Sequence, residues 1–431
     1  GGKPINAARF LADIERVRAS LPNGTHVLNV CADRYRFTVG LAAALVARKV
    51  SLLPSTHTRE VIRQLAAFAP DVFCLTDEAR CAIDLPRVHY PEEPLAAVTS
   101  REIPQIDAAQ LAAYVFTSGS TGTPLPHRKT WSKLVRCVRD GAQRLGLRAD
   151  RPHAIVSTVP AQHMYGFESS VLVALQSGSA LCAERPFYPA DICRALTEVR
   201  RPRMLVTTPV HLRTLLAAAV ELPQVELVVC ATAPLSQNLA REVEARFATR
   251  LLEIYGSTET GQIATRRTAD TIEWQLWPDV QLTIEKEKTW ARGGHVEEPT
   301  LMCDVLELTA HDRFLLHGRT ADLVNIAGKR SSIAYLNHQL NAIPGVIDGT
   351  FLLPNDDQAS AIGVTRLAAL VVAPKLDPAT LTQGLRERID PAFLPRPLLF
   401  VDQLPRNATG KLPQAALHAL LARHQKTAAS S

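Results

Sequence analysis

The feature that most restricts the fold of this chain is a repeated alternation of short, β-rich apolar runs with helical stripes. The runs Ala154 to Thr158, Met204 to Thr207 and Leu251 to Tyr255 predict strands, and His211 to Ala219 and Ser236 to Phe247 predict helices between them. Strands that alternate with helices form layered structures whose sheets are largely parallel. The sequence therefore predicts an α/β fold.

A change of character divides the chain into two parts. Between Gln281 and Leu316, turns and charged residues interrupt strand-like runs, and a smaller module begins near Gly318-Arg319. Its strands and helices make an α+β unit of roughly a hundred residues, within the usual range for a domain. We expect a large N-terminal domain of layered sheets, residues 1–317, and a small C-terminal domain, residues 318–431.

Charge and composition exclude several classes of function. The net charge is +6, but the basic residues are dispersed, which disfavours nucleic-acid binding. No apolar run approaches membrane-spanning length and the N-terminus lacks a signal pattern, so we expect a cytoplasmic protein without a membrane span. The eight cysteines are scattered without a Cys-x-x-Cys pair, which argues against zinc and against a disulfide framework.

A loop rich in Gly, Ser and Thr follows the predicted strand Leu111 to Phe116. The loop runs from Thr117 to Pro126, and a helical stripe begins at Trp131 with Thr130 as the expected N-cap. Glycines let a backbone approach closely, and exposed N–H groups and hydroxyls can bind a phosphate. The loop lacks the Walker lysine. An ordinary exposed turn is the alternative interpretation.

A second stretch, Glu253 to Gly261, carries an apolar strand into a turn that holds a carboxylate. Tyr255 can stack on a base, Thr258 can bond a phosphate, and Glu259 can hold Mg²⁺. The alternative is a strand-end turn with an exposed glutamate.

Both stretches resemble motifs of the adenylate-forming superfamily, which comprises acyl-CoA synthetases, aryl-acid ligases and peptide-synthetase adenylation domains. The loop Thr117 to Pro124 resembles its phosphate-binding loop, and Tyr255 to Glu259 resembles its Tyr-Gly-x-Thr-Glu motif. The resemblance spans about residues 26 to 415. The stretch Asn29 to Phe37 looks most like the compact AMP-ligases of aryl-polyene and xanthomonadin pigment biosynthesis.

The resemblance implies a nucleotide site for ATP and an acid pocket. Pro160 to Phe167 resembles the family's aromatic-gate motif, in which His163 lines the route between the acid and the nucleotide, although a lone histidine is often structural. Asp304 would accept the ribose hydroxyls, the alternative being a loop-capping aspartate. The residues implied for ATP are Thr117, Ser118, Gly119, Ser120, Thr121, Gly122, Ala233, Tyr255, Gly256, Ser257, Asp304 and Arg319. Those implied for the acid are His163, Tyr165, Ala231 and Thr232.

The stretch Leu404 to Lys411 resembles the family's terminal Pro-Arg-x-x-x-Gly-Lys motif. An ammonium can bridge a carboxylate and the α-phosphate, which repel each other until they bond. Lys411, Glu259, Thr258 and His163 are therefore the expected catalytic residues, with Glu259 as the metal ligand. A surface lysine before a helix is the bland alternative for Lys411.

Three departures from the family's pattern are visible. Leu125 replaces the usual loop lysine, so another basic group, in Pro126 to Lys129, has to serve the leaving pyrophosphate. At the junction, Asp322 is one place from the usual position, which leaves the hinge residue open. Cys230 to Leu235 lacks the family's paired glycines, which predicts a narrower acid pocket.

The resemblance implies an AMP-forming acid–thiol ligase with ATP and Mg²⁺. A small carboxylic acid, hydroxybenzoate-like from the pigment-ligase resemblance, would become an acyl-AMP. After the small domain swings about the Arg319–Asp322 junction, the acyl group would pass to the phosphopantetheine of an acyl carrier protein. The alternatives are a coenzyme A ligase for an aryl or fatty acid, a non-catalytic nucleotide-binding module, and a P-loop-type phosphotransferase.

Overall fold

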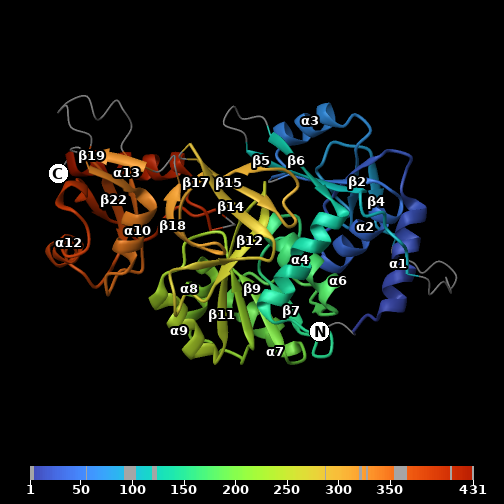
Figure 1. Ribbon diagram of the computed structural model, residues 1–431, viewed down its shortest axis with the longest axis horizontal. Helices are drawn as coiled ribbons and strands as arrows, with labels where there is room; N and C mark the ends of the chain where they lie inside the picture. Colours follow the sequence, from blue (N-terminus) through green and yellow to red (C-terminus); the bar gives the residue numbers. More distant parts are fainter. Residues whose placement is uncertain are drawn as a thin grey trace.

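Layers of helices and sheets build the protein, as the alternation predicts (Figure 1). The computed structural model describes residues 4–54, 56–91, 103–118, 124–286, 288–319, 323–326, 329–353, 366–407 and 410–429. Among these residues the strands form two large sheets and three small ones. The predicted α/β fold is confirmed.

The first large sheet has six strands in the order β4-β3-β1-β2-β5-β6. Its first five strands are mutually parallel, and β6 joins the edge antiparallel to β5. The strands are β1 (His26–Asn29), β2 (Val50–Leu53), β3 (Phe73–Thr76), β4 (Arg87–His89), β5 (Leu111–Ser118) and β6 (Pro124–Thr130).

Strand β6 corrects the prediction that the loop extends to Pro126. The chain is already a strand from Pro124, paired with β5 from Ser118↔Pro124 to Leu111↔Thr130. Prolines are tolerated here because β6 has only one strand neighbour and its outer edge makes no ladder. Thr130 precedes the helix as predicted, but its hydroxyl donates to Glu297 Oε1 (2.7 Å) rather than capping.

The second large sheet has nine strands in the order β17-β18-β13-β12-β11-β10-β9-β7-β8. The strands from β8 to β11 are parallel, and those from β12 to β17 are antiparallel. Their bounds are β7 (Ala154–Ser157), β8 (Ala180–Leu181), β9 (Arg203–Thr207), β10 (Leu227–Cys230), β11 (Arg250–Ser257), β12 (Gly261–Arg266), β13 (Trp274–Leu276), β17 (Asp304–Ala310) and β18 (Arg313–Arg319). Beside it, β14 (Val280–Glu285), β15 (Lys288–Gly293) and β16 (Thr300–Leu301) form a small sheet.

Helices lie between the two large sheets and on both outer faces. One continuous core joins strands of both sheets with α1, α2, α4 and the segment α5–η1–α6. Helix α3 covers the outer face of the first sheet, and α7, α8 and α9 cover that of the second. The bounds are α1 (Ala7–Ser20), α2 (Arg34–Val46), α3 (Arg59–Phe68), α4 (Trp131–Leu145), α5 (Met164–Gly166), the π-helix η1 (Phe167–Leu172), α6 (Val173–Ser177), α7 (Pro189–Glu198), α8 (Pro209–Ala217) and α9 (Gln237–Phe247).

The strand sequences explain this layering. In β9, Met204 and Val206 face the inner core while Leu205 faces the outer helices. Because successive side chains point to opposite faces, a strand covered on both sides must be apolar throughout. Parallel strands that are all apolar therefore need helices on both faces, which is what the structure has.

The C-terminal part has its own apolar cores, built only from residues after Leu323. Its location beside the larger part is clear in Figure 1, where it is coloured orange and red. The elements are β19 (Leu323–Ile326), β20 (Lys329–Ser332), α10 (Ile333–Asn341), β21 (Asp348–Leu352), β22 (Ala368–Val372), α12 (Pro378–Arg386), η3 (Pro391–Phe393), β23 (Leu398–Phe400) and α13 (Gln414–Ala429). Within the described ranges, we find no helix long and apolar enough to cross a membrane.

Candidate active site

The predicted site residues follow the carboxyl ends of the parallel strands of the second sheet. His163 comes after β7, Thr232 after β10, and Glu259 after β11, and Thr208, which is not among the predicted residues, comes after β9. Ligands of open α/β sheets bind outside the carboxyl ends of the strands. The topology therefore gathers residues that are almost a hundred positions apart in the sequence.

The turn between β11 and β12 depends on two glycines. A Cβ on Gly256 would lie 2.3 Å from the carbonyl oxygen of Gly261, and Gly261 has a φ of +75°. Ser257 and Thr260 close the turn through hydrogen bonds between their hydroxyls and backbone N–H groups. Thr258 and Glu259 are thereby held half-buried at the tip.

Tyr255 and Asp304 are joined directly, although 49 positions separate them. The phenol donates to Asp304 Oδ2 at 2.5 Å, and the ring packs against Trp274 and Phe314. The tyrosine is buried, whereas the aspartate is half-buried at the start of β17. Two residues predicted to bind the nucleotide thus form one rigid unit.

His127 connects the phosphate-loop strand to the turn that carries Glu259. Its Nε2 lies 2.9 Å from Thr117 Oγ1 and 3.8 Å from Glu259 Oε1. Burial lowers the pKa of His127, and the nearby Glu259 opposes that effect. The ring is therefore mainly neutral at neutral pH. Its position on β6 places it on the same face as Leu125 and Lys129, since side chains alternate along a strand.

Lys129 lies behind this turn and is only 4% exposed. Its ammonium donates to the carbonyl oxygen of Glu259 at 2.8 Å. Burial lowers the pKa of Lys129, while the carboxylate of Glu168 opposes that effect. Lys129 therefore supports the turn from inside the protein and is not exposed to solvent.

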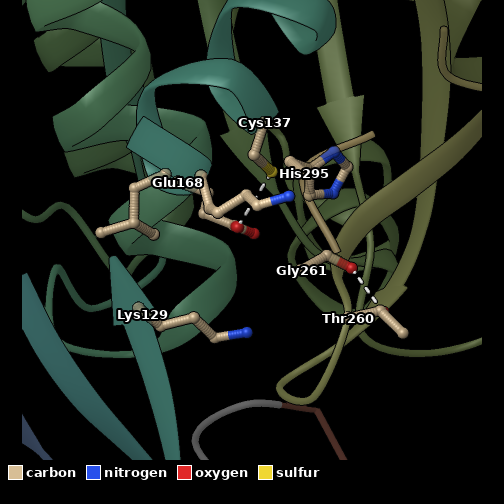
Figure 2. A pocket seen from close by; sticks show the side chains of 8 residues that line it. Lys129, Cys137, Glu168, Thr260, Gly261 and His295 are labelled. Atoms are coloured by element: carbon tan, nitrogen blue, oxygen red, sulfur yellow. Dashed lines mark hydrogen bonds between the residues drawn. The ribbon is translucent and has the colours of Figure 1, made fainter. Parts of the chain in front are cut away.

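Lys129 lines a small buried pocket with room for about one water molecule (Figure 2). Cys137 Sγ donates to Glu168 Oε1 at 3.1 Å, and burial raises the pKa of Glu168 to about 7. The pKa of His295 falls to about 3, because it is buried beside cationic groups, Lys129 foremost. The other lining residues are Lys133, Leu134, Thr260 and Gly261.

The two predicted acid-pocket residues on the gate segment, His163 and Tyr165, differ in whether their polar atoms are hydrogen-bonded within the protein. The buried Nδ1 of His163 has no hydrogen-bond partner among the described residues. Burial lowers the pKa of His163 to about 4, and the charge of Lys411 adds to that effect. Tyr165 is buried, and its hydroxyl donates to the carbonyl oxygens of Val229 (2.9 Å) and Thr207 (3.2 Å). Its proton is therefore engaged within the protein.

The turn after β10 takes an unusual backbone conformation. Thr232 has a φ of +82°, in the left-handed region that favours glycine. Ala231 is buried and Ala233 is half-buried on either side of it. Thr232, which has a branched side chain, thus occupies a backbone conformation that suits glycine. A non-glycine residue in this region costs roughly 1–3 kcal/mol, and such strain clusters at binding sites.

The loop before Lys411 lies against the large domain. Gly410 has a φ of +79°, and a Cβ there would lie 3.2 Å from Val210 Cγ2 and 3.8 Å from Thr208 Oγ1. The loop before Lys411 therefore lies against the start of α8, and the charge of Lys411 acts on His163.

Several predicted residues lie outside the described part. Gly119, Ser120, Thr121 and Gly122 of the phosphate loop are among them, as is Asp322 of the predicted hinge. For Ser118 and Arg319 only the backbone is described, and Arg319 pairs with Asp304 in the β17–β18 ladder.

The residues that the sequence predicts do not include Glu168, His295, Arg213 or Asp348. Glu168 is the only charged residue from Met164 to Ser177, and this isolation is a usable signal for a buried carboxyl group. His127 was named only within a basic run. Once β6 is known to be a strand, His127 can be identified, because residues two positions apart, such as Leu125 and His127, lie on the same face.

Comparison with known proteins identifies the family of the chain. The protein-family model described as AMP-binding enzyme matches residues 22–292. A 4-coumarate–CoA ligase from Rhodobacter capsulatus is 30% identical over 308 residues, which are 70% of this chain and 75% of the relative. The 3-hydroxybenzoate–CoA/4-hydroxybenzoate–CoA ligase of Thauera aromatica is 22% identical over 409 residues, 82% of this chain and 74% of that protein.

The solved structure of ATP-bound MatB from Rhodopseudomonas palustris is similar to this protein with a TM-score of 0.81 and 19% sequence identity. The superposition covers 97% of this chain and 94% of the MatB chain. At that identity the likeness establishes the fold alone. The family model, however, spans more than half of the chain, and the Rhodobacter relative is similar over most of it. The chain therefore belongs to the AMP-binding enzyme family, within the adenylate-forming superfamily.

Proposed function

We propose that this protein activates a small aromatic carboxylic acid with ATP and transfers the acyl group to a thiol. A carboxylate oxygen attacks the α-phosphorus, and pyrophosphate leaves with the electron pair of the broken P–O bond. The thiol sulfur, having lost its proton, then attacks the acyl carbon, and AMP leaves. The observation that carries the proposal is that Gly410, directly before Lys411, lies against Thr208 and Val210. These residues follow β9, at the same end of the second sheet where His163 and Glu259 follow β7 and β11.

Lys411 is the proposed cation of the first half-reaction. Two anions must approach each other, and a preorganised ammonium between them reduces their repulsion. Neutral His163 beside it adds no competing charge, because its pKa of about 4 keeps it unprotonated near pH 7. Holding the reacting groups in line supplies a further part of the rate.

The phosphates are assigned to the loop from Thr117 to Gly122, with His127 beside it. Leu125 is exposed and cannot carry charge, and Lys129 is buried against a carbonyl oxygen. His127 is the remaining basic group of this run that faces Glu259, since Arg128 lies exposed on the opposite face of β6. We assign His127 the hydrogen bond to pyrophosphate that the family's lysine would make.

The turn at Glu259 fits a magnesium ion held together with substrate phosphates. Mg²⁺ prefers oxygen ligands and is commonly bound by one or two carboxylates plus phosphate oxygens and waters. Glu259 supplies one carboxylate and Thr258 one hydroxyl. Among the described residues no group of three or more His, Cys, Asp or Glu side chains forms a self-sufficient cage. When bound, the ion would neutralise phosphate charge.

The nucleoside is assigned to the unit formed by Tyr255 and Asp304. The tyrosine orients the carboxyl group of Asp304, which suits two neighbouring ribose hydroxyls. Arg319, paired with Asp304 through the backbone, is proposed to bond the ribose or a phosphate. The segments expected to border adenine are Ala233 and Gly256-Ser257.

The acid is proposed to be a hydroxybenzoate or a close aryl relative. Ala231 and Thr232 put methyl groups where the family has glycines, and these groups narrow the proposed acid pocket. His163 can bond a ring hydroxyl through its unpartnered Nδ1. Relatives named as ligases of 4-coumarate and of 3- and 4-hydroxybenzoate agree with a flat aryl acid.

The thiol is coenzyme A or the phosphopantetheine of a carrier protein. The resemblance to pigment ligases favours the carrier, and this part stays a prediction. The names of the relatives favour coenzyme A. Coenzyme A is therefore the first acceptor to test.

A panel of acids tests the proposed substrate class. The kcat/KM should be measured for 3- and 4-hydroxybenzoate, 4-coumarate, benzoate and an octanoate-to-palmitate series in one assay with ATP and coenzyme A. We expect hydroxylated aryl acids to exceed benzoate clearly, because a site built to bond a hydroxyl rejects analogues lacking it. Preference for octanoate or longer acids would instead identify a fatty-acyl ligase.

A further inference from the structure

The loop that carries Lys411 is held by hydrogen bonds to the backbone and the side chain of Asn407. The N–H of Gly410 donates to the carbonyl oxygen of Asn407 (2.8 Å), and the N–H of Lys411 donates to Asn407 Oδ1 (2.9 Å). These bonds shape the loop but do not fix its position relative to the rest of the molecule.

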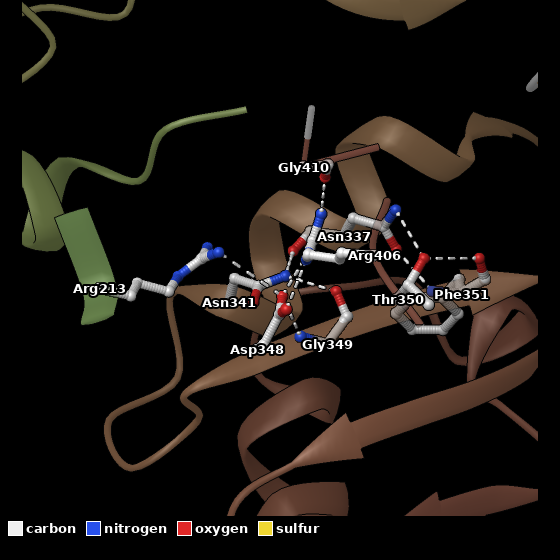
Figure 3. A network of polar contacts seen from close by, with 9 residues as sticks. All are labelled: Arg213, Asn337, Asn341, Asp348, Gly349, Thr350, Phe351, Arg406 and Gly410. Atoms are coloured by element: carbon white, nitrogen blue, oxygen red, sulfur yellow. Dashed lines mark hydrogen bonds and ion pairs between the residues drawn. The ribbon is translucent and has the colours of Figure 1, made fainter. Parts of the chain in front are cut away.

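Arg406 anchors this loop to the small domain. Its Nη1 donates to the carbonyl oxygen of Gly410 at 2.7 Å, and its Nε and Nη2 bond the two carboxylate oxygens of Asp348, each at 2.8 Å (Figure 3). Such a two-pronged pair is directional as well as strong. The backbone directly before Lys411 is thus fixed to the first residue of β21.

Arg213 reaches the same carboxylate from the large domain. It projects from α8 toward Asp348, with Nη1 3.9 Å from Oδ1 (Figure 3). The side chains of Arg213, Asp348 and Arg406 are 21%, 13% and 17% exposed. Burial lowers the pKa of Arg213, the charge of Asp348 opposes this, and Arg406 adds to it. One carboxylate therefore serves two sheltered guanidinium groups.

The same helix also contacts the loop through its first turn. Val210 and Thr208, at the start of α8, lie against Gly410. Helix α8 therefore contacts the small domain through two residues about one helical turn apart. Val210 lies against Gly410, and Arg213 reaches Asp348.

We propose that Arg213 is a positioning residue that docks the small domain in the arrangement for acyl-AMP formation, and so places Lys411. Arg406 and Asp348 belong to one domain and move together. Arg213 belongs to the large domain, so its contact with Asp348 must break when the small domain swings for thiol transfer. The proposal rests on the proposed two-step function. Loss of Arg213 weakens the first half-reaction and spares the second.

The experiment compares Arg213→Ala, Arg213→Lys and the control Arg246→Ala, which removes an exposed arginine from the neighbouring helix α9. The first half-reaction is followed by ATP–pyrophosphate exchange with 4-hydroxybenzoate, and the second by transfer from supplied 4-hydroxybenzoyl-AMP to coenzyme A. We expect Arg213→Ala to lower exchange by about tenfold, within the usual range of coupling between sites. Transfer should be unchanged or faster, and Arg213→Lys should restore part of the exchange. The control should alter neither.

Hydrogen–deuterium exchange of residues 404–413 gives a readout that needs no turnover. Uptake there should rise in Arg213→Ala and stay at the wild-type level in Arg246→Ala. Wild-type uptake together with wild-type pyrophosphate exchange would overturn the proposal, as would equal loss of both half-reactions. If no acid supports exchange in the wild type, the proposed function fails, and deuterium uptake alone decides whether Arg213 docks the loop.

Discussion

The Nε2 of His127 lies 3.8 Å from Oε1 of Glu259. This imidazole connects the edge strand of the first sheet to the turn between β11 and β12 of the second sheet. Its Nε2 also lies 2.9 Å from Thr117 Oγ1. Two motifs more than a hundred residues apart thus share one basic group, at the place where the family's loop lysine is missing. This arrangement is the basis of our proposal that His127 bonds the departing pyrophosphate.

Replacing His127 by alanine should therefore impair pyrophosphate release and rebinding. A hydrogen bond to a charged group is worth about 1.5–3 kcal/mol, so kcat/KM for pyrophosphate in the exchange assay should fall by roughly 10–100-fold. The matched control is Arg128→Ala, which removes the exposed neighbour on the opposite face of β6. Equal effects of the two substitutions would show that His127 has no special role.

Thr232→Gly should broaden the range of acids. Glycine removes the branched side chain from the turn after β10 and suits the φ of +82°. The ratio of kcat/KM for 4-coumarate to that for 4-hydroxybenzoate should rise several-fold. An unchanged ratio would place Thr232 away from the acid.

Between pH 6.5 and pH 8, the free energy of unfolding should fall because Glu168 loses its proton. Its pKa of about 7 in the folded protein is above the ordinary value of 4.5, so the folded state binds more protons and loses stability as the pH rises through 7. The buried His163 and His295, with pKa values of about 4 and 3, oppose this as long as an unfolded histidine is partly protonated, which extends somewhat above pH 6.5. They act equally in the wild type and in a Glu168 variant, so the difference between the two proteins isolates Glu168.

The test is urea unfolding at pH 6.5 and pH 8 for the wild type and Glu168→Gln. The wild type should lose about 1 kcal/mol more than the variant over this interval, since one pKa unit corresponds to about 1.4 kcal/mol. Glu242→Gln, at an exposed position on α9, is the control and should follow the wild type. Parallel pH profiles for the wild type and Glu168→Gln would contradict the shifted pKa.

The proximity of Lys411 to His163 can be tested by titration. Because the ammonium lowers the pKa of His163, Lys411→Ala should raise that pKa from about 4, while burial keeps it below the ordinary 6.5. Histidine resonances in NMR spectra report the change. His153, whose pKa is lowered mainly by burial, stands before β7, at the opposite end of that strand from His163. It serves as an internal control and should not move. A static His163 would mean that the loop does not dock in solution.

Much of the fold could be predicted because its strands and helices are strongly patterned. The stripe beginning at Trp131 predicted a helix, and α4 spans Trp131–Leu145. The edge strand β6 was missed because its composition is that of a loop, with prolines that only an edge tolerates. The segment from Met164 to Ser177 was missed because it is nearly all apolar or small and contains a π-helix, so no helical stripe stands out.

The site divides in the same way. Thr117, Glu259 and Lys411 stand in local motifs, so the sequence alone could nominate them. Arg213 and Asp348 stand in no motif, and the 135 positions between them are bridged only by the packing of two domains. The buried pairing of Lys129 with the Glu259 turn likewise depends on how two sheets meet.

Acid-dependent ATP–pyrophosphate exchange, measured side by side for the wild type and Lys411→Ala, tests the central claim most directly. The account predicts exchange that requires 4-hydroxybenzoate or a related aryl acid and that falls by orders of magnitude in the variant, because a preorganised charge at a reacting centre is worth a few kcal/mol. The variant should still pass a supplied acyl-AMP to coenzyme A. Exchange that survives the loss of Lys411, or that needs no acid, would contradict the account.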